Sequence, residues 1–69
     1  MSEDRDRLWR WVKRTAARYY QTPVWDREHD ELSAEGLIER MDDHPEYGYC
    51  QFRLTAAGWD AVRAEQQAA

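Results

Sequence analysis

The chain has 69 residues, which is enough for a single domain over residues 1–69 with a small core. Its one cysteine, Cys50, excludes an internal disulfide, and its net charge of −4 argues against a non-specific nucleic-acid binder. The charge is uneven, because residues 1–20 carry six basic and three acidic side chains, whereas residues 21–69 carry four basic and eleven acidic ones.

The N-terminal residues do not predict a secretion signal. Met1 is followed by Ser2, Glu3 and Asp4, without an apolar segment. No apolar run approaches the roughly 20 residues that a membrane-spanning helix needs. A single cysteine fits a reducing compartment. We therefore expect a cytoplasmic protein without a membrane partner.

The first predicted element is a helix over about residues 6–20, after a frayed start at 1–4. Its apolar stripe has helical spacing and consists of Leu8, Val12, Thr15, Ala16 and Tyr19. The opposite face carries basic residues with a tryptophan beside them: Arg7, Arg10, Trp11, Lys13, Arg14 and Arg18. Because Trp11 lies toward these arginines and away from the apolar stripe, we expect it to be at least partly exposed.

A second helix is predicted over about residues 24–35. Thr22 is expected to cap it, with Pro23 at the first helical position, because proline lacks the N–H that this position leaves unused. Gly36 is expected to end it in the left-handed conformation.

The remaining elements are two strands and a helix. Residues 37–41 are expected to form a strand, residues 42–48 a polar turn, and residues 49–54 a second strand whose alternation places Phe52 and Leu54 inward. Thr55 is expected to cap a final helix over about residues 56–66, with residues 67–69 frayed.

These elements predict an α+β domain in the order α-α-β-β-α, with a two-stranded hairpin. The predicted core takes apolar residues from every element: Leu8, Val12, Leu32, Leu37, Phe52, Leu54, Trp59 and Val62.

Two short runs carry a resemblance to a known family. The first is Leu32 followed by Gly36-Leu37-Ile38-Glu39-Arg40, and the second is Arg53-Leu54-Thr55 followed by Gly58. Together they resemble the MarR and PadR groups of bacterial winged-helix proteins over residues 24–66, abbreviated on the N-terminal side. The resemblance implies a winged-helix fold in which the helix before Gly36 enters the DNA major groove and the hairpin wing contacts the backbone.

The helix in that position is acidic in this chain. Residues 26–35 hold one arginine, Arg27, and the acids Asp26, Glu28, Asp30, Glu31 and Glu35. Because phosphate contacts dominate DNA affinity, we expect this helix to be repelled by a duplex.

Two surfaces are candidate binding sites. The basic residues of the first helix, with Trp11, fit an acidic protein or a nucleic-acid backbone; the alternative is an ordinary solvated face. The acidic surface fits a mimic of nucleic-acid phosphates, or serves only solubility. It comprises Asp26, Glu28, Asp30, Glu31, Asp42, Asp43 and Glu46.

No residue pattern predicts catalysis, a cofactor or a metal site. The acids near His44 match no known cation loop, and the chain has no nucleophile motif, phosphate loop or cysteine pair. A domain of this size is also expected to lack a pocket of roughly 300 Å³ or more.

We therefore predict a non-enzymatic module that binds another protein, of which a phage- or mobile-element-encoded inhibitor or adaptor is the most concrete version. The alternative is a winged-helix transcriptional regulator that approaches DNA with the basic face of the first helix. A homodimer is also plausible, because it would cover the aromatic side chains of the first helix.

Overall fold

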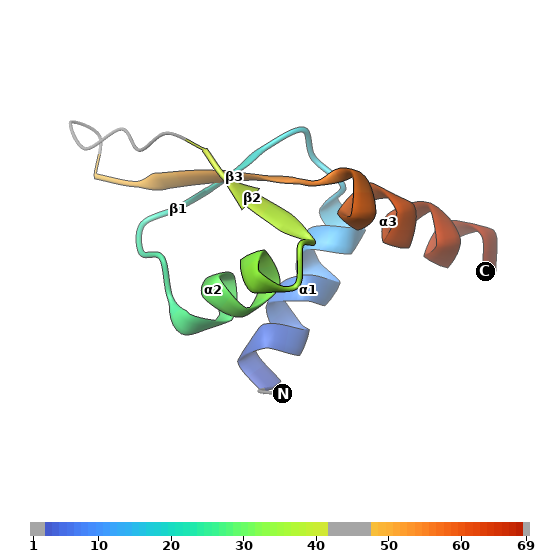
Figure 1. The fold of residues 1–69 in the computed structure, drawn as a ribbon, viewed down its shortest axis with the longest axis horizontal. Coiled ribbons are helices and arrows are strands. Elements are labelled where there is room, and N and C mark those ends of the chain that lie inside the picture. The colour runs from blue at the N-terminus through green and yellow to red at the C-terminus, as the bar shows by residue number, and fades with distance from the viewer. Residues whose placement is uncertain (1–2, 42–47, 69) are drawn as a thin grey trace.

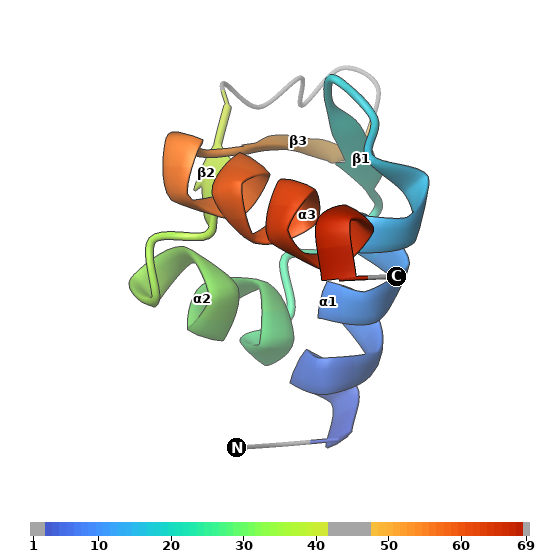
Figure 2. The ribbon, with the colours of Figure 1, turned by 90° about the vertical axis from the view of Figure 1, so that its right-hand side faces the viewer.

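A computed structural model describes residues 3–41 and 48–68. The elements are α1 (Glu3–Thr15), β1 (Tyr20–Thr22), α2 (Arg27–Ala34), β2 (Ile38–Arg40), β3 (Cys50–Leu54) and α3 (Ala56–Ala68). The strands form one antiparallel sheet in the order β1-β3-β2, and both views place α1 and α2 on the same side of it (Figures 1 and 2). The predicted α+β class is confirmed. Among the described residues, no helix is both long and apolar enough to cross a membrane.

The strand β1 was not predicted, so the expected order lacks one strand. Its register places Tyr20 opposite Phe52 and Thr22 opposite Cys50. The predicted first helix is too long, because α1 ends at Thr15 and Ala16 has a φ of 48°. The Tyr20 hydroxyl then caps the helix end: it donates to the Val12 carbonyl at 2.7 Å and accepts the Ala17 N–H at 2.9 Å.

The second helix is shorter than predicted and has a different cap. Asp26 is its N-cap residue, so Thr22 does not cap it and Pro23 is not its first residue. The Thr22 hydroxyl donates instead to the Val24 carbonyl at 2.8 Å. At the other end, Gly36 has a φ of 77°, which confirms the predicted left-handed stop.

The C-terminal elements follow the prediction more closely. The strands are shorter than expected, and most of the predicted turn at 42–48 lies outside the described residues. The Gly58 N–H donates to the Thr55 hydroxyl at 3.1 Å, which confirms the predicted cap of α3. Helical structure begins at Glu3 and continues to Ala68, further in both directions than the predicted frayed ends allow.

The core combines one face of the sheet with the inner faces of all three helices. Five of the predicted members are buried: Val12, Leu32, Phe52, Leu54 and Val62. The other three predicted members pack against them half-buried, and the places of full burial are taken by Trp9, Tyr20 and Ile38. Ile38 is inward because it is opposite Leu54, and paired residues point to the same face of a sheet.

The first helix is rotated relative to the predicted stripe. Arg5, Trp9 and Val12 are its buried residues, whereas Thr15 and Tyr19 are exposed. An indole removes roughly 150–250 Å² from water, far more than a threonine can, so turning Trp9 inward is favoured. Arg5 is buried with it because both guanidinium edges are satisfied: Nε donates to Glu35 at 2.8 Å, a second N–H donates to the other Glu35 oxygen, and Nη1 donates to Asp6 at 3.0 Å.

Candidate functional site

The five predicted partner-binding residues lie on the surface, and we call them the basic face: Arg7, Arg10, Trp11, Arg14 and Arg18. Because α1 buries Arg5, Trp9 and Val12, its 3.6-residue period turns three of the arginines directly away from the core. Arg18 was predicted to lie on the helix, but it lies in the segment between α1 and β1.

The arginines of the basic face are not paired with any acid in the part of the chain that the structure describes. Within residues 3–41 and 48–68, none of these four side chains forms an ion pair. Other cations of the chain do form one: Arg5 pairs with Glu35 and Asp6, Lys13 with Glu65, and Arg53 with Glu39. With respect to these described segments, the basic face therefore presents unpaired positive charge to a molecule that approaches α1.

Trp11 supplies an apolar contact beside those charges. Its side chain is 47% exposed, which confirms the prediction that it is partly exposed. Its ring packs against Tyr20, with ring centroids 5.3 Å apart. An indole held on one side and open on the other needs little reordering to bind, and Trp and Arg are enriched among residues that dominate binding energy.

Two hollows run along α1, which corrects the expectation that the domain has no pocket of this size. One, of about 510 Å³, is lined by Glu3, Arg5, Asp6, Arg7, Trp9, Arg10 and Lys13. The other, of about 380 Å³, lies between α1 and α3 and is lined by Arg10, Lys13, Arg14, Val62, Glu65 and Gln66. The sequence did not predict them, because they depend on how α1 and α3 lie against each other.

The predicted acidic surface is partly engaged within the chain. Glu31 is half-buried and pairs with Arg27 at 3.6 Å, and Asp30 accepts the Trp25 Nε1–H at 2.5 Å. Asp26 is exposed and Glu28 is half-buried. The remaining predicted members, Asp42, Asp43 and Glu46, lie outside the described residues.

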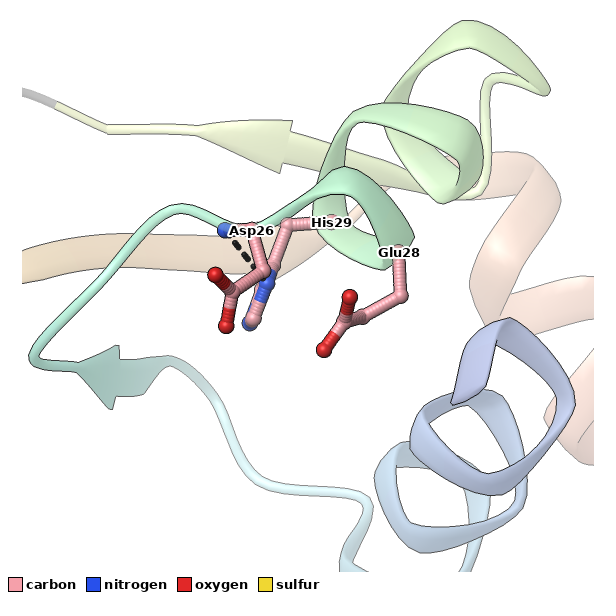
Figure 3. A group of neighbouring side chains, drawn as sticks. All are labelled: Asp26, Glu28 and His29. Carbon is pink, nitrogen blue, oxygen red and sulfur yellow. Dashed lines mark hydrogen bonds between the residues drawn. The ribbon is translucent and has the colours of Figure 1, made fainter. Parts of the chain in front are cut away.

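A group with metal-ligand atoms occurs at the start of α2, where the sequence did not suggest one. Ligand atoms of Asp26, Glu28 and His29 lie within 4.8 Å of one another (Figure 3). His29 Nδ1 already accepts the Asp26 backbone N–H at 3.2 Å, as the dashed line in Figure 3 shows. The arrangement is explained by helix capping, in which the third helical residue bonds back to the cap residue.

His29 also belongs to an aromatic cluster around Phe52. Its ring meets Phe52 edge-on with centroids 5.5 Å apart. The centroid of the Trp25 ring lies 5.1 Å from that of His29. Burial lowers the pKa of His29 below its ordinary value, and the nearby acids Glu28, Asp26 and Asp30 only partly oppose this effect. The neutral ring is also the form that can accept the Asp26 N–H.

The free energy of unfolding is therefore expected to fall as the pH drops below about 6.5. The unfolded chain takes up a proton at His29 near pH 6.5, the ordinary value, whereas the folded chain resists it until a lower pH. Glu35, whose pKa is held below its ordinary 4.5 by Arg5, begins to lose its contribution only at lower pH. Urea unfolding across this range measures the slope.

The chain offers a matched control for this measurement, because its only other histidine is His44. His29→Gln should flatten the slope below about pH 6.5, and His44→Gln should leave it unchanged. A slope that persists in His29→Gln and disappears in His44→Gln would show that the buried ring is not the responsible group.

In comparisons with protein-family models, with curated proteins and with solved structures, no match to this chain was found. The winged-helix resemblance therefore stays a prediction, and the function has to be argued from the surface of the domain.

Proposed function

We propose that this domain is a non-enzymatic binding module that holds an acidic partner protein through its basic face. The observation that carries the proposal is the set of four arginines without ion pairs among the described residues, around a tryptophan that is 47% exposed. An inhibitor or adaptor encoded by a phage or mobile element, acting in the cytoplasm, is its most concrete form.

Charge supports a protein partner over a nucleic acid. The chain has a net charge of −4, so a duplex that approaches α1 also meets the long-range field of an acidic molecule. Helix α2, which the winged-helix resemblance would place in the major groove, has acids in its first turn. A protein partner can place carboxylates opposite the arginines and an apolar group against Trp11 without the uniform charge of a phosphate backbone.

A DNA-binding regulator of winged-helix type is the second candidate. It is favoured by the spacing of Arg7, Arg10 and Arg14, which places three guanidinium groups along roughly 10 Å of one helix face. Such binding would be strongly salt-dependent and would not involve the acidic residues of α2.

Mimicry of nucleic-acid phosphates by the acidic surface has less support. Glu31 and Asp30 are already held by Arg27 and Trp25, so they are less available to a basic partner than free carboxylates would be. Among the described residues, the four arginines of the basic face form no ion pair, and Trp11 adds a large aromatic contact beside them.

Replacing Trp11 tests the proposal. Trp11→Ala should preserve the fold and weaken partner binding by ~2 kcal/mol or more, the range of residues that dominate an interface. The partner is captured from a lysate of the native host and identified by mass spectrometry, and its affinity for each variant is then measured by calorimetry.

Tyr19→Ala is the matched control, because Tyr19 is 54% exposed and lies outside the basic face. It should bind normally. A folded Trp11→Ala variant with full affinity would refute the proposal. Sequence-specific binding of a duplex that is lost with Arg10→Ala would support the regulator, and a captured partner identical to the chain itself would show a homodimer.

A further inference from the structure

The hollow between α1 and α3 has cationic side chains on one wall and an acid on the other. Arg10, Lys13 and Arg14 come from α1, and Glu65 comes from α3. Figure 2 shows α3 passing in front of the C-terminal half of α1. Val62, which is buried, contributes apolar surface between them.

This hollow adjoins the one nearer the N-terminus, because Arg10 and Lys13 line both. We call the two together the α1 groove. In the hollow nearer the N-terminus, Trp9 adds an apolar surface and Arg7 adds a further cation. The α1 groove thus combines buried apolar residues with a row of cations, and it borders the basic face. Its acids are Glu3 and Asp6 near the N-terminus and Glu65 on α3, so the segment around Arg10, Lys13 and Arg14 is its most basic part.

Among Arg7, Arg10, Lys13 and Arg14, Lys13 is the least exposed. Its side chain is 22% exposed, and its ammonium group lies 5.5 Å from the centre of the Trp9 ring. Glu65 reaches it from α3, with Nζ and Oε2 2.9 Å apart, while 61% of the Glu65 side chain remains exposed. A largely enclosed cation therefore faces a carboxylate that is mostly exposed to solvent.

We propose that the α1 groove binds a carboxylate-rich segment of the partner protein, and that Glu65 occupies the position that a partner carboxylate takes on binding. This inference rests on the proposed function and adds to it the chemistry of the partner segment and a competitor within the domain.

The exchange is energetically accessible. An exposed ion pair contributes little to stability, because water screens it and because two long side chains must be held in place. A partner carboxylate that replaces Glu65 leaves Lys13 paired, so no cation is stranded. Arg10 and Arg14, which have no ion pair among the described residues, give an acidic segment additional contacts that Glu65 cannot make.

Fluorescence anisotropy with a defined probe tests the inference. The probe is a fluorescein-labelled peptide of Glu and Ala, and its match has Gln in place of every Glu. Glu65→Gln should bind the acidic peptide about two- to fivefold more tightly than the unaltered chain, since the competing ion pair is gone. The Gln peptide should show no such gain.

Glu39→Gln is the matched control for net charge. Glu39 is also half-exposed and also forms a 2.9 Å ion pair, with Arg53, but it lies on the sheet and not in the groove. It makes the same change in net charge as Glu65→Gln and should leave the affinity nearly unchanged. In a Lys13→Gln background, Glu65→Gln should lose its effect, because the two side chains then no longer interact.

The outcomes separate the inference from the proposed function. Equal affinities of Glu65→Gln and Glu39→Gln would overturn the competitor role, while weaker peptide binding by Arg10→Gln would still support the basic face as the binding surface. If neither Arg10→Gln nor Trp11→Ala weakens peptide binding, both proposals fall. Tighter binding of a fluorescein-labelled DNA duplex than of the acidic peptide would overturn the protein segment as the occupant.

Discussion

Replacing Phe52 with alanine is expected to unfold the domain. Phe52 is fully buried, and Tyr20 stacks on it with ring centroids 5.0 Å apart, while His29 and Trp25 meet it edge-on at 5.5 and 6.0 Å. Loss of a large core aromatic typically costs ~3–5 kcal/mol. At roughly 0.05–0.15 kcal/mol per residue, a domain of this size has only about 3–10 kcal/mol in total.

Chemical denaturation followed by tryptophan fluorescence measures this loss, and Arg53→Ala provides the comparison. Arg53 is the next residue of β3 but is exposed on the other face, where it pairs with Glu39. Its replacement should cost about 1 kcal/mol or less, as for a surface ion pair. Similar unfolding midpoints for both variants would show that Phe52 is not the centre of the core.

Gly58→Ala is expected to be nearly as damaging, although alanine is the better helix former. A Cβ atom at Gly58 would lie 2.2 Å from the Leu37 carbonyl oxygen and 2.8 Å from Leu54 Cδ2. The Leu37 carbonyl cannot move freely, because it accepts the Thr55 N–H at 3.1 Å. We expect a loss of about 2 kcal/mol or more, which exceeds the helix-propensity gain of about 1 kcal/mol.

Gly36→Ala makes the same chemical change at a position with open space. Nothing lies within 4 Å of a Cβ there, but the φ of 77° is unfavourable for alanine, at a cost of about 1–2 kcal/mol. Asparagine tolerates this conformation, so Gly36→Asn should recover part of the loss, whereas Gly58→Asn should recover none. Thermal unfolding of the four variants decides between the two mechanisms, and recovery at both positions would contradict the close contact at Gly58.

The features that were predicted correctly are those that a few neighbouring residues determine. Alternation along β3 places Phe52 and Leu54 inward because side chains of a strand point alternately to its two faces. The stop at Gly36 and the cap at Thr55 depend on one residue each, and both are confirmed.

The structure adds the reason why the two runs that resemble the winged-helix groups occur together. The Thr55 hydroxyl donates to the Gly36 carbonyl, and the Thr55 N–H donates to the carbonyl of Leu37. Gly58 then allows α3 to approach the backbone at Leu37 closely. The spacing within each run is local, but the contact between them joins residues far apart in the chain.

The features that were missed depend on distant residues. The three residues of β1 are too few to show a period, and their strand conformation comes from pairing with β3. The predicted rotation of α1 was wrong because its apolar residues allow two alternative stripes. The burial of Arg5 depends on Glu35, which is 30 residues away. An arginine in a helical stripe is ordinarily assigned to the surface.

The candidate site also combines features that neighbouring residues determine with features that depend on distant residues. Exposure of Arg7, Arg10 and Arg14 follows from helical spacing, and the partial exposure of Trp11 was predicted from its distance from the apolar stripe. The contact between Lys13 and Glu65 was not predictable, because it requires α1 and α3 to lie side by side. The composition of a helix face is a local property, whereas a groove belongs to two elements.

The strand order β1-β3-β2 also bears on how the domain avoids aggregation. The longest strand is in the middle, and the two strands with an open edge have three residues each. Pro23 follows β1 directly and has no N–H to donate to another chain. Short, interrupted edges are poor templates for pairing with strands of other molecules. Within the described residues, the sheet can therefore leave both edges uncovered without offering a long strand to another molecule.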